Sequence, residues 1–197
     1  MNQQATDAPR VILASASPRR RALLEQAGVA FRIVVAEVDE RVLPGETPSA
    51  YVLRVAHDKA REIQSRERAA LPVLGADTAV VLEHRILGKP NGRAEAIAML
   101  QSLSGRTHEV FSAVALARAG QPPLESLSVS RVTFADLDPD WIEAYCATGD
   151  PMDKAGAYGV QGRAAEKISR IEGSFSGIMG LPLYETCKLL RQAKVLF

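Results

Sequence analysis

Apolar residues along the chain follow two spacings, one typical of strands and one typical of helices. Short, β-branched runs predict strands at residues 11–14, 31–35, 73–82, 85–87, 109–118 and 126–135, with two shorter candidates at 166–171 and 174–179. Apolar stripes at helical spacing predict helices that begin near residues 18, 47, 94, 138 and 182. Because strands and helices interleave, and because 109–135 reads as an antiparallel pair, we expect an α/β fold with a mixed central sheet and flanking helices. Residues 1–10 are polar and are expected to be flexible, ahead of a single domain over 11–197.

Composition narrows the classes of partner. The chain has 197 residues and a formal net charge of +1, so it lacks the general positive field of a nucleic-acid binder, and any anion recognition must be local. Its two cysteines lie apart, with no CxxC motif or Cys/His cluster, which argues against a zinc site and favours a reducing compartment. No leader segment and no long apolar run is visible, so we expect no membrane partner and a cytoplasmic location.

The first candidate site follows the first predicted strand. Ser17 is a good N-cap and Pro18 suits the first position of a helix, yet three arginines occupy the first turn. Each cation at that positive end is disfavoured by roughly 0.3–1 kcal/mol, and a bound anion would reverse the sign. The hydroxyl-rich turn with Ser15, together with Arg19 and Arg20, therefore predicts a phosphate site. The alternative is that the arginines point into solvent.

Asp77 is the strongest catalytic candidate. It lies between two apolar runs, where a carboxylate must be hydrogen-bonded, paired or metal-bound. Gly75 and Ala76 before it would leave room for a ligand beside the strand, and Thr78 after it could bind substrate. The alternatives are an aspartate that ties down a turn and a threonine that only fills a strand.

Acidic and basic residues elsewhere could complete such a site. If the 31–35 strand pattern continues, its apolar face becomes acidic at Glu37 and Asp39, followed by Glu40. Magnesium is commonly held by one or two carboxylates together with substrate phosphates, so this group could carry it. Lys59 lies beside an apolar helical stripe and Lys89 lies in a Gly-Lys-Pro turn. Taken singly, a solvated acidic loop and two surface lysines explain these residues as well.

The segment 153–162 is rich in glycine. Three glycines at a spacing of three would allow a ligand to approach the backbone closely. Lys154 offers charge, Tyr158 a stacking face, and Gln161 an amide that can donate and accept at once, as the edge of a base requires. The alternative is a glycine-rich turn with a surface glutamine.

Taken together, these segments resemble the Maf family of nucleoside triphosphate pyrophosphatases. The matching motifs run in order over about residues 11–190: LASASPRR at 13–20, EVDE at 37–40, the lysine-containing 56–60, GADT at 75–78, GKP at 88–90, LSGRTH at 103–108, GDPMDKAGAYGVQG at 149–162 and GLPLYET at 180–186. The Ala-Asp-Thr and Ala-Tyr-Gly-x-Gln forms are similar to the subgroup that acts on dTTP and UTP. A departure at 163–166, where relatives often carry glycine or aromatic residues, bears on the substrate and not on the reaction.

The resemblance implies a fold of two lobes around a central cleft, as in inosine-triphosphatase-like proteins, often as a homodimer. It implies hydrolysis of a nucleoside triphosphate to the monophosphate and pyrophosphate with a divalent cation, Mg²⁺ or Mn²⁺, in nucleotide-pool house-cleaning. The residues that correspond are the catalytic Asp77, Lys59 and Lys89, the substrate-binding Ser15, Arg19, Arg20, Thr78, Lys154 and Gln161, and the metal ligands Glu37 and Asp77. Asp77 would act as general base, and Thr78 and Gln161 would read the base. Two alternatives stay open: a non-catalytic nucleotide-binding regulator of cell division, and the same enzyme class acting on non-canonical nucleotides.

Overall fold

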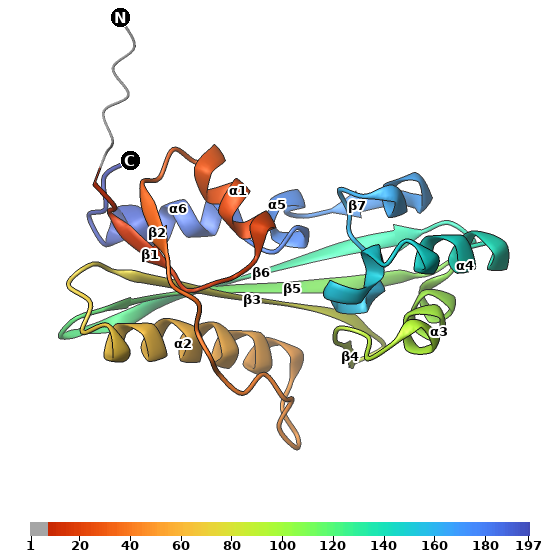
Figure 1. Cartoon of the computed structure of the whole chain (residues 1–197), viewed down its shortest axis with the longest axis horizontal. Coiled ribbons are helices and arrows are strands. Elements are labelled where there is room, and N and C mark those ends of the chain that lie inside the picture. Colours follow the sequence, from red (N-terminus) through yellow and green to blue (C-terminus); the bar gives the residue numbers. More distant parts are fainter. Residues whose placement is uncertain (1–7) are drawn as a thin grey trace, which may run out of the picture.

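A seven-stranded mixed sheet forms the centre of the computed structural model, which describes residues 8–197 (Figure 1). The strand order is β2-β1-β3-β5-β6-β7, with β4 paired to β3. The strands are β1 (Val11–Leu13), β2 (Phe31–Ile33), β3 (Val73–Leu82), β4 (Arg85–Leu87), β5 (Thr107–Arg118), β6 (Gln121–Phe134) and β7 (Ile168–Glu172). β1 is parallel to β2 and β3, whereas the long strands β3, β5 and β6 are antiparallel. The predicted α/β class with a mixed central sheet is confirmed.

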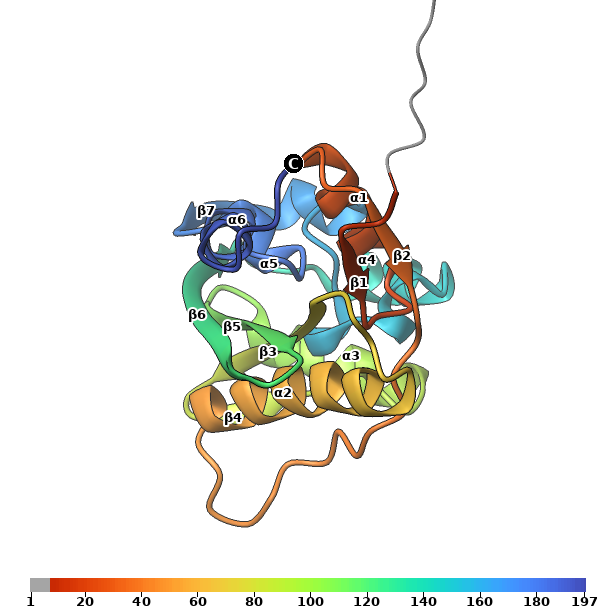
Figure 2. The same ribbon diagram turned by 90° about the vertical axis from the view of Figure 1, so that its left-hand side faces the viewer.

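Helices cover both faces of this sheet. The helices are α1 (Pro18–Gln26), α2 (Pro48–Arg66), α3 (Arg93–Leu103), α4 (Pro139–Ala147), α5 (Phe175–Ile178) and α6 (Leu183–Gln192), with 3-10 turns at Asp150–Asp153, Ala155–Ala157 and Arg163–Lys167. Figure 2 shows α2 along one face and α1 and α6 along the other. Ser17, Thr47 and Asp138 cap α1, α2 and α4 through their side-chain oxygens, which explains why these helices begin where the sequence predicts.

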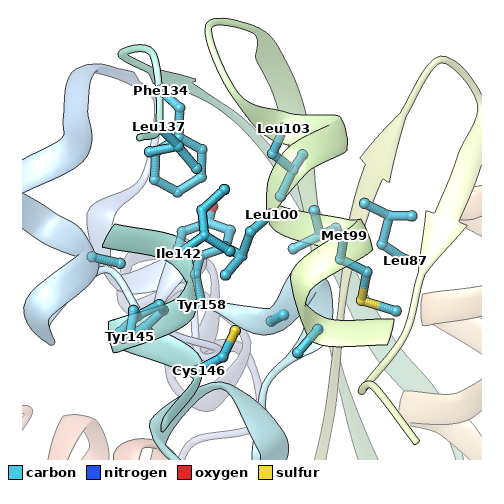
Figure 3. Close-up of a cluster of buried hydrophobic side chains, with 14 of the residues drawn as sticks. Leu87, Met99, Leu100, Leu103, Phe134, Leu137, Ile142, Tyr145, Cys146 and Tyr158 are labelled. Atoms are coloured by element: carbon cyan, nitrogen blue, oxygen red, sulfur yellow. The ribbon is translucent and has the colours of Figure 1, made fainter. Parts of the chain in front are cut away.

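The core has three parts that meet on the sheet. One packs β1, α1 and α6 against Leu74 and Leu116, and a second packs α2 against the opposite face. The third packs α3 and α4 at the far end of the long strands, where Leu100, Ile142 and Tyr158 converge (Figure 3). The long strands thus connect two separately packed ends of the molecule.

The structure differs from two of the predicted strands. The strand predicted at 174–179 is wrong, because this segment is the short helix α5, whose N-cap Ser174 accepts a hydrogen bond from the Gly177 N–H. The strand predicted at 31–35 ends at Ile33. Residues 1–7, most of the segment expected to be flexible, lie outside the described residues. No helix within residues 8–197 is long and apolar enough to cross a membrane.

Within the part of the chain that the structure describes, one edge of β3 is left without a neighbouring strand along part of its length. On that edge β1 pairs with Val73 and Leu74, and β4 pairs with the stretch from Val80 to Leu82. Between these two contacts no strand within residues 8–197 pairs with that edge, and Asp77 and Thr78 lie in this unpaired stretch.

Candidate active site

A cleft of about 790 Å³ lies at the open edge of β3. Its walls come from the turn before α1, the segment after β2, α2, β3, the turn after β4, the glycine-rich segment and the segment after α5. The structure brings all but one of the predicted site residues to this cleft: Ser15, Arg19, Arg20, Lys59, Asp77, Thr78, Lys89, Lys154 and Gln161. Glu37 is the exception.

Asp77, Lys59 and Glu40 form a chain of charges on one wall. Lys59 Nζ lies 2.9 Å from Asp77 Oδ1 and 2.8 Å from Glu40 Oε1. Asp77 is only 5% exposed, and its second oxygen, Oδ2, is buried with no hydrogen-bond partner among the described residues. A buried carboxylate oxygen without a partner is costly, so it is available to a ligand that the cleft admits.

The close contact between α2 and β3 holds this chain in place. A Cβ at Gly75 would lie 2.1 Å from the backbone oxygen of Ala56, so only glycine lets α2 approach the strand this closely. The space at Gly75 is therefore occupied by the helix that carries Lys59. The expectation that Gly75 and Ala76 leave room for a ligand is wrong, because the side chain of Ala76 also packs in the core beside Val114.

Burial and pairing act in opposite directions on the two carboxylates. Burial raises the pKa of Asp77 above its ordinary value, although the nearby charges of Lys59 and Arg20 oppose the rise. Burial also tends to raise the pKa of Glu40, but Lys59, together with the charges of Lys89 and Arg20, outweighs it and leaves that pKa below its ordinary value. A carboxylate with a raised pKa is suited to take a proton from a nucleophile.

Two of the three arginines in the first turn of α1 face the cleft. Arg20 Nε donates to Gly180 O at 2.8 Å, and its terminal nitrogens donate to the hydroxyls of Ser15 and Thr78, both at 3.4 Å. Arg19 pairs with Asp153 across the cleft at 3.3 Å, whereas Arg21 points away and pairs with Glu25 on the same helix. The alternative of three solvent-facing arginines therefore holds only for the third.

Lys89 and Gln161 lie at the rim. Both are exposed, and Lys89 forms no ion pair with any residue in the 8–197 range. Its charge still reaches the cleft, since it lowers the pKa of Glu40. The Gly88 carbonyl beside it accepts a hydrogen bond from the Gly156 N–H at 3.1 Å, which ties this turn to the glycine-rich segment.

The space beside two glycines of the glycine-rich segment is filled by other side chains of the protein. Gly156 has a φ of +67° and lies against Val80, and a Cβ at Gly159 would lie 2.8 Å from Cε of Lys154. These two glycines admit Val80 and Lys154, while Gly159 and Gly162 also line the cleft, so the close approach of a ligand stays a prediction. The predicted stacking role of Tyr158 stays a prediction: its ring lines the cleft but is largely buried, and its hydroxyl lies 2.7 Å from His108 Nε2.

A buried hydroxyl network beside Thr78 was missed by sequence reasoning. Ser112 Oγ donates to Gly177 O at 2.6 Å and lies 3.0 Å from Thr78 Oγ1. Ser112 and Thr78 are cross-strand partners on β5 and β3, and Ser112 is 1% exposed. The signal available in the sequence was a single serine in an apolar strand, which did not indicate its partners.

Of the acidic residues at 37–40, Glu40 lines the cleft and Glu37 does not. The prediction for Glu37 assumed that strand alternation continues to residue 39, but β2 ends at Ile33 and the following chain has no strand periodicity. Glu37 is exposed and does not line the cleft, whereas Glu40 lines it and pairs with Lys59.

The carboxylates of the cleft are suited to a metal ion that the substrate also binds. Within residues 8–197 no group of three or more His, Cys, Asp or Glu side chains could hold an ion alone. Asp77 with its unpartnered oxygen and Glu40 on the same lysine provide two carboxylates. That number suits a magnesium ion completed by phosphate oxygens, because magnesium is usually bound by one or two carboxylates and substrate.

Comparisons of the sequence with known proteins identify its family. A family model described as "Maf-like protein" matches residues 10–193. A dTTP/UTP pyrophosphatase of Methylobacillus flagellatus is 52% identical over 187 residues, which is 94% of this chain and 94% of that protein. A dTTP/UTP pyrophosphatase of Methylococcus capsulatus is 53% identical over 92% of this chain and 90% of its own length. Among solved structures, a HAM1 protein from Coxiella burnetii aligns over 65% of this chain and 74% of its own with 18% identity and a TM-score of 0.44, which is too distant to support a conclusion.

Proposed function

The chain belongs to the Maf-like protein family, and from this membership and the cleft we propose that it hydrolyses nucleoside triphosphates, preferably dTTP and UTP. The products are the nucleoside monophosphate and pyrophosphate, a reaction that removes nucleotides from the cellular pool. One observation carries the proposal: a buried carboxylate with a free oxygen faces a cleft whose walls bear Arg19, Arg20, Lys59 and Lys89. A homodimer and a cytoplasmic location stay predictions.

Asp77 is the general base in this proposal. Its Oδ1 is held by Lys59, which leaves Oδ2 to accept a proton from water. The water attacks the α-phosphorus, the bond from this atom to the bridging oxygen breaks, and pyrophosphate leaves with the electron pair. The raised pKa of Asp77 makes it a stronger base than an exposed aspartate, and such groups contribute about 10²–10⁴-fold in rate.

The cations stabilise the charge that develops on the leaving group. Lys89 has no carboxylate partner among the described residues, and Arg20 donates only to neutral oxygens, so both can turn to phosphate without breaking an ion pair. Preorganised cations of this kind are the main means by which proteins accelerate phosphoryl transfer. Arg19 must exchange Asp153 for the substrate.

A divalent cation would be held by Asp77 and Glu40, in place of the predicted pair of Asp77 and Glu37. When bound, Mg²⁺ or Mn²⁺ would neutralise phosphate charge. Lys59 lies between the two carboxylates, and its charge acts to lower the pKa of each. Thr78 and Gln161 remain the proposed contacts to the base, and Lys154 a proposed contact to the substrate.

Pyrophosphate release from UTP in the presence of Mg²⁺ tests this function. We expect the wild type to form UMP and pyrophosphate in equal amounts, and a protein that binds UTP without consuming it would support a non-catalytic regulator. Glu40→Gln should raise the Mg²⁺ concentration needed for half-maximal rate about tenfold, whereas Glu37→Gln should leave it unchanged. If the two variants behave in the opposite way, the assignment of Glu40 is wrong.

A further inference from the structure

The two faces of β3 offer a nucleotide different surroundings. Asp77 points to the face covered by α2, where Lys59 and Glu40 lie. Thr78, the next residue, points to the opposite face, as strand geometry requires. On that side the cleft is lined by apolar side chains of Val80, Val110, Ile178 and Met179. Arg20 reaches Thr78 from the same face, so Thr78 lies between the apolar part of the cleft, which suits the base, and the cations, which suit the phosphates.

The direction of the hydrogen bonds at Thr78 follows from counting protons. A serine hydroxyl has one proton, and a carbonyl oxygen can only accept. Ser112 Oγ lies 2.6 Å from Gly177 O, so its proton is used there. The contact of 3.0 Å between Ser112 and Thr78 must then be a hydrogen bond that Thr78 donates.

Thr78 is thereby left with lone pairs only. Its other nearby acceptor, Gly180 O, is farther away at 3.4 Å and already accepts from Arg20 Nε at 2.8 Å. Arg20 also donates weakly to Thr78 Oγ1 at 3.4 Å, which is consistent with a hydroxyl that accepts. Since Thr78 is partly exposed to the cleft, a ligand there meets a hydrogen-bond acceptor.

We propose that Ser112 is a positioning residue that fixes the Thr78 hydroxyl as an acceptor and so favours uracil and thymine over cytosine. The N3 atom of uracil and thymine carries a hydrogen and donates, whereas N3 of cytosine carries a lone pair and would face another lone pair. This inference rests on the proposed function and deepens it, because it assigns the discrimination between pyrimidines to a buried serine that does not touch the substrate.

The test compares UTP with CTP in the wild type and in Ser112→Ala. Without Ser112 the Thr78 hydroxyl can turn and donate to cytosine N3, so the ratio of kcat/KM for UTP over CTP should fall about fivefold, the worth of one neutral hydrogen bond. The change should arise mainly from a lower KM for CTP. An equal loss for both nucleotides, or an unchanged ratio, would mean that Ser112 is only structural and would overturn the proposal.

Ser130→Ala is the matched control. Ser130 is also a buried serine that packs under the segment containing α5, as Ser112 does through Gly177. It accepts a hydrogen bond from the Ser174 N–H at 2.9 Å but makes no contact with Thr78. It should leave the UTP/CTP ratio unchanged, which separates loosening of the segment from reorientation of Thr78. If Ser130→Ala lowers the ratio as much as Ser112→Ala, the inference is wrong.

A second variant tests whether Ser112 acts through Thr78, and a binding measurement makes the test independent of turnover. Thr78→Val removes the hydroxyl, so adding Ser112→Ala to it should produce no further change in the ratio, whereas additive effects would contradict the coupling.

The UTP/CTP ratio is also measured as a ratio of Kd values with non-hydrolysable UTP and CTP analogues. A wild type that binds them without cleaving UTP or CTP would overturn the proposed function, while the Kd ratio would still decide the role of Ser112.

Discussion

Two lysines in the cleft each hold two carboxylates, and the comparison shows which part of the site carries the chemistry. Lys59 joins Asp77 and Glu40, and Lys154 joins Asp150 and Asp153 at 3.0 and 2.6 Å. Both lysine side chains are largely buried. Their acidic partners differ, because Asp77 is enclosed in β3 while the partners of Lys154 are partly exposed in a turn.

Asp77 differs from the other three carboxylates, Glu40 included, in the direction of its pKa shift. For Asp77 burial prevails and raises the pKa. For Asp150, burial is outweighed by the Tyr145 hydroxyl and Lys154, which lower the pKa, and the same balance with Lys154 lowers the pKa of Asp153. The first cluster keeps an oxygen without a partner, whereas the second satisfies its members. We infer that the unsatisfied cluster is the reactive one and that the satisfied cluster holds Lys154 in place at the cleft wall.

The largest expected effect separates the two clusters by activity. Asp77→Asn should lower kcat for pyrophosphate release from UTP about 10³-fold, because the amide cannot take the proton from water. Asp150→Asn keeps an oxygen that can accept from Tyr145 and should lower kcat no more than about threefold. Equal losses in the two variants would show that the clusters do not differ in role.

The next largest effect is a difference in folding stability between variants of the Lys59 cluster and of the Lys154 cluster. Lys59→Met leaves Asp77 buried without its cation, and breaking such a pair costs about 3–5 kcal/mol of unfolding free energy. Lys154→Met frees partly exposed carboxylates that water can solvate, so the cost should be about 1 kcal/mol or less. Urea denaturation of both variants at neutral pH measures the difference, and a larger loss in Lys154→Met would contradict the comparison.

A smaller effect tests how rigidly each lysine is held. Gly75→Ala places a Cβ against the backbone of α2, which cannot yield locally, so we expect a loss of about 2 kcal/mol. Gly159→Ala meets the flexible end of Lys154, which can move, so the loss should be about 1 kcal/mol or less. Thermal unfolding of the two alanine variants ranks them, and similar melting temperatures would contradict the account.

The smallest effect concerns pH. Asp77 acts as a carboxylate, so activity is lost as pH falls through its pKa, and burial moves this loss above the ordinary carboxyl value of about 4. Removal of the Lys59 charge should move the acidic limb of kcat/KM to still higher pH, since this cation opposes the rise. Lys154→Met should leave the limb in place. An acidic limb that moves to lower pH in Lys59→Met would contradict the assignment.

Much of this site could be predicted from local sequence. Ser17 and Pro18 begin α1 as expected, and Asp77 lies in a buried strand as its apolar flanks predict. Local pattern was sufficient there because capping and strand periodicity are set by a few neighbouring residues. The motif resemblance then gave the family, and all but one of the site residues that it implied line the cleft.

Other features depend on contacts between distant segments. The end of β2 at Ile33 decides that Glu40 faces Lys59, and the Gly75 space is taken by α2, which lies elsewhere in the sequence. The helix α5 forms because Ser174 caps it, in a segment without a clear period. The state of the Thr78 hydroxyl depends on Ser112 of β5, so no reading of the β3 motif alone could supply it.

The most direct measurement of the central claim is hydrolysis of UTP in water enriched in oxygen-18. The account predicts that the label enters UMP, because the water activated by Asp77 attacks the α-phosphorus, and that pyrophosphate stays unlabelled. Label in pyrophosphate or in inorganic phosphate would show attack at another phosphorus and would contradict the claim.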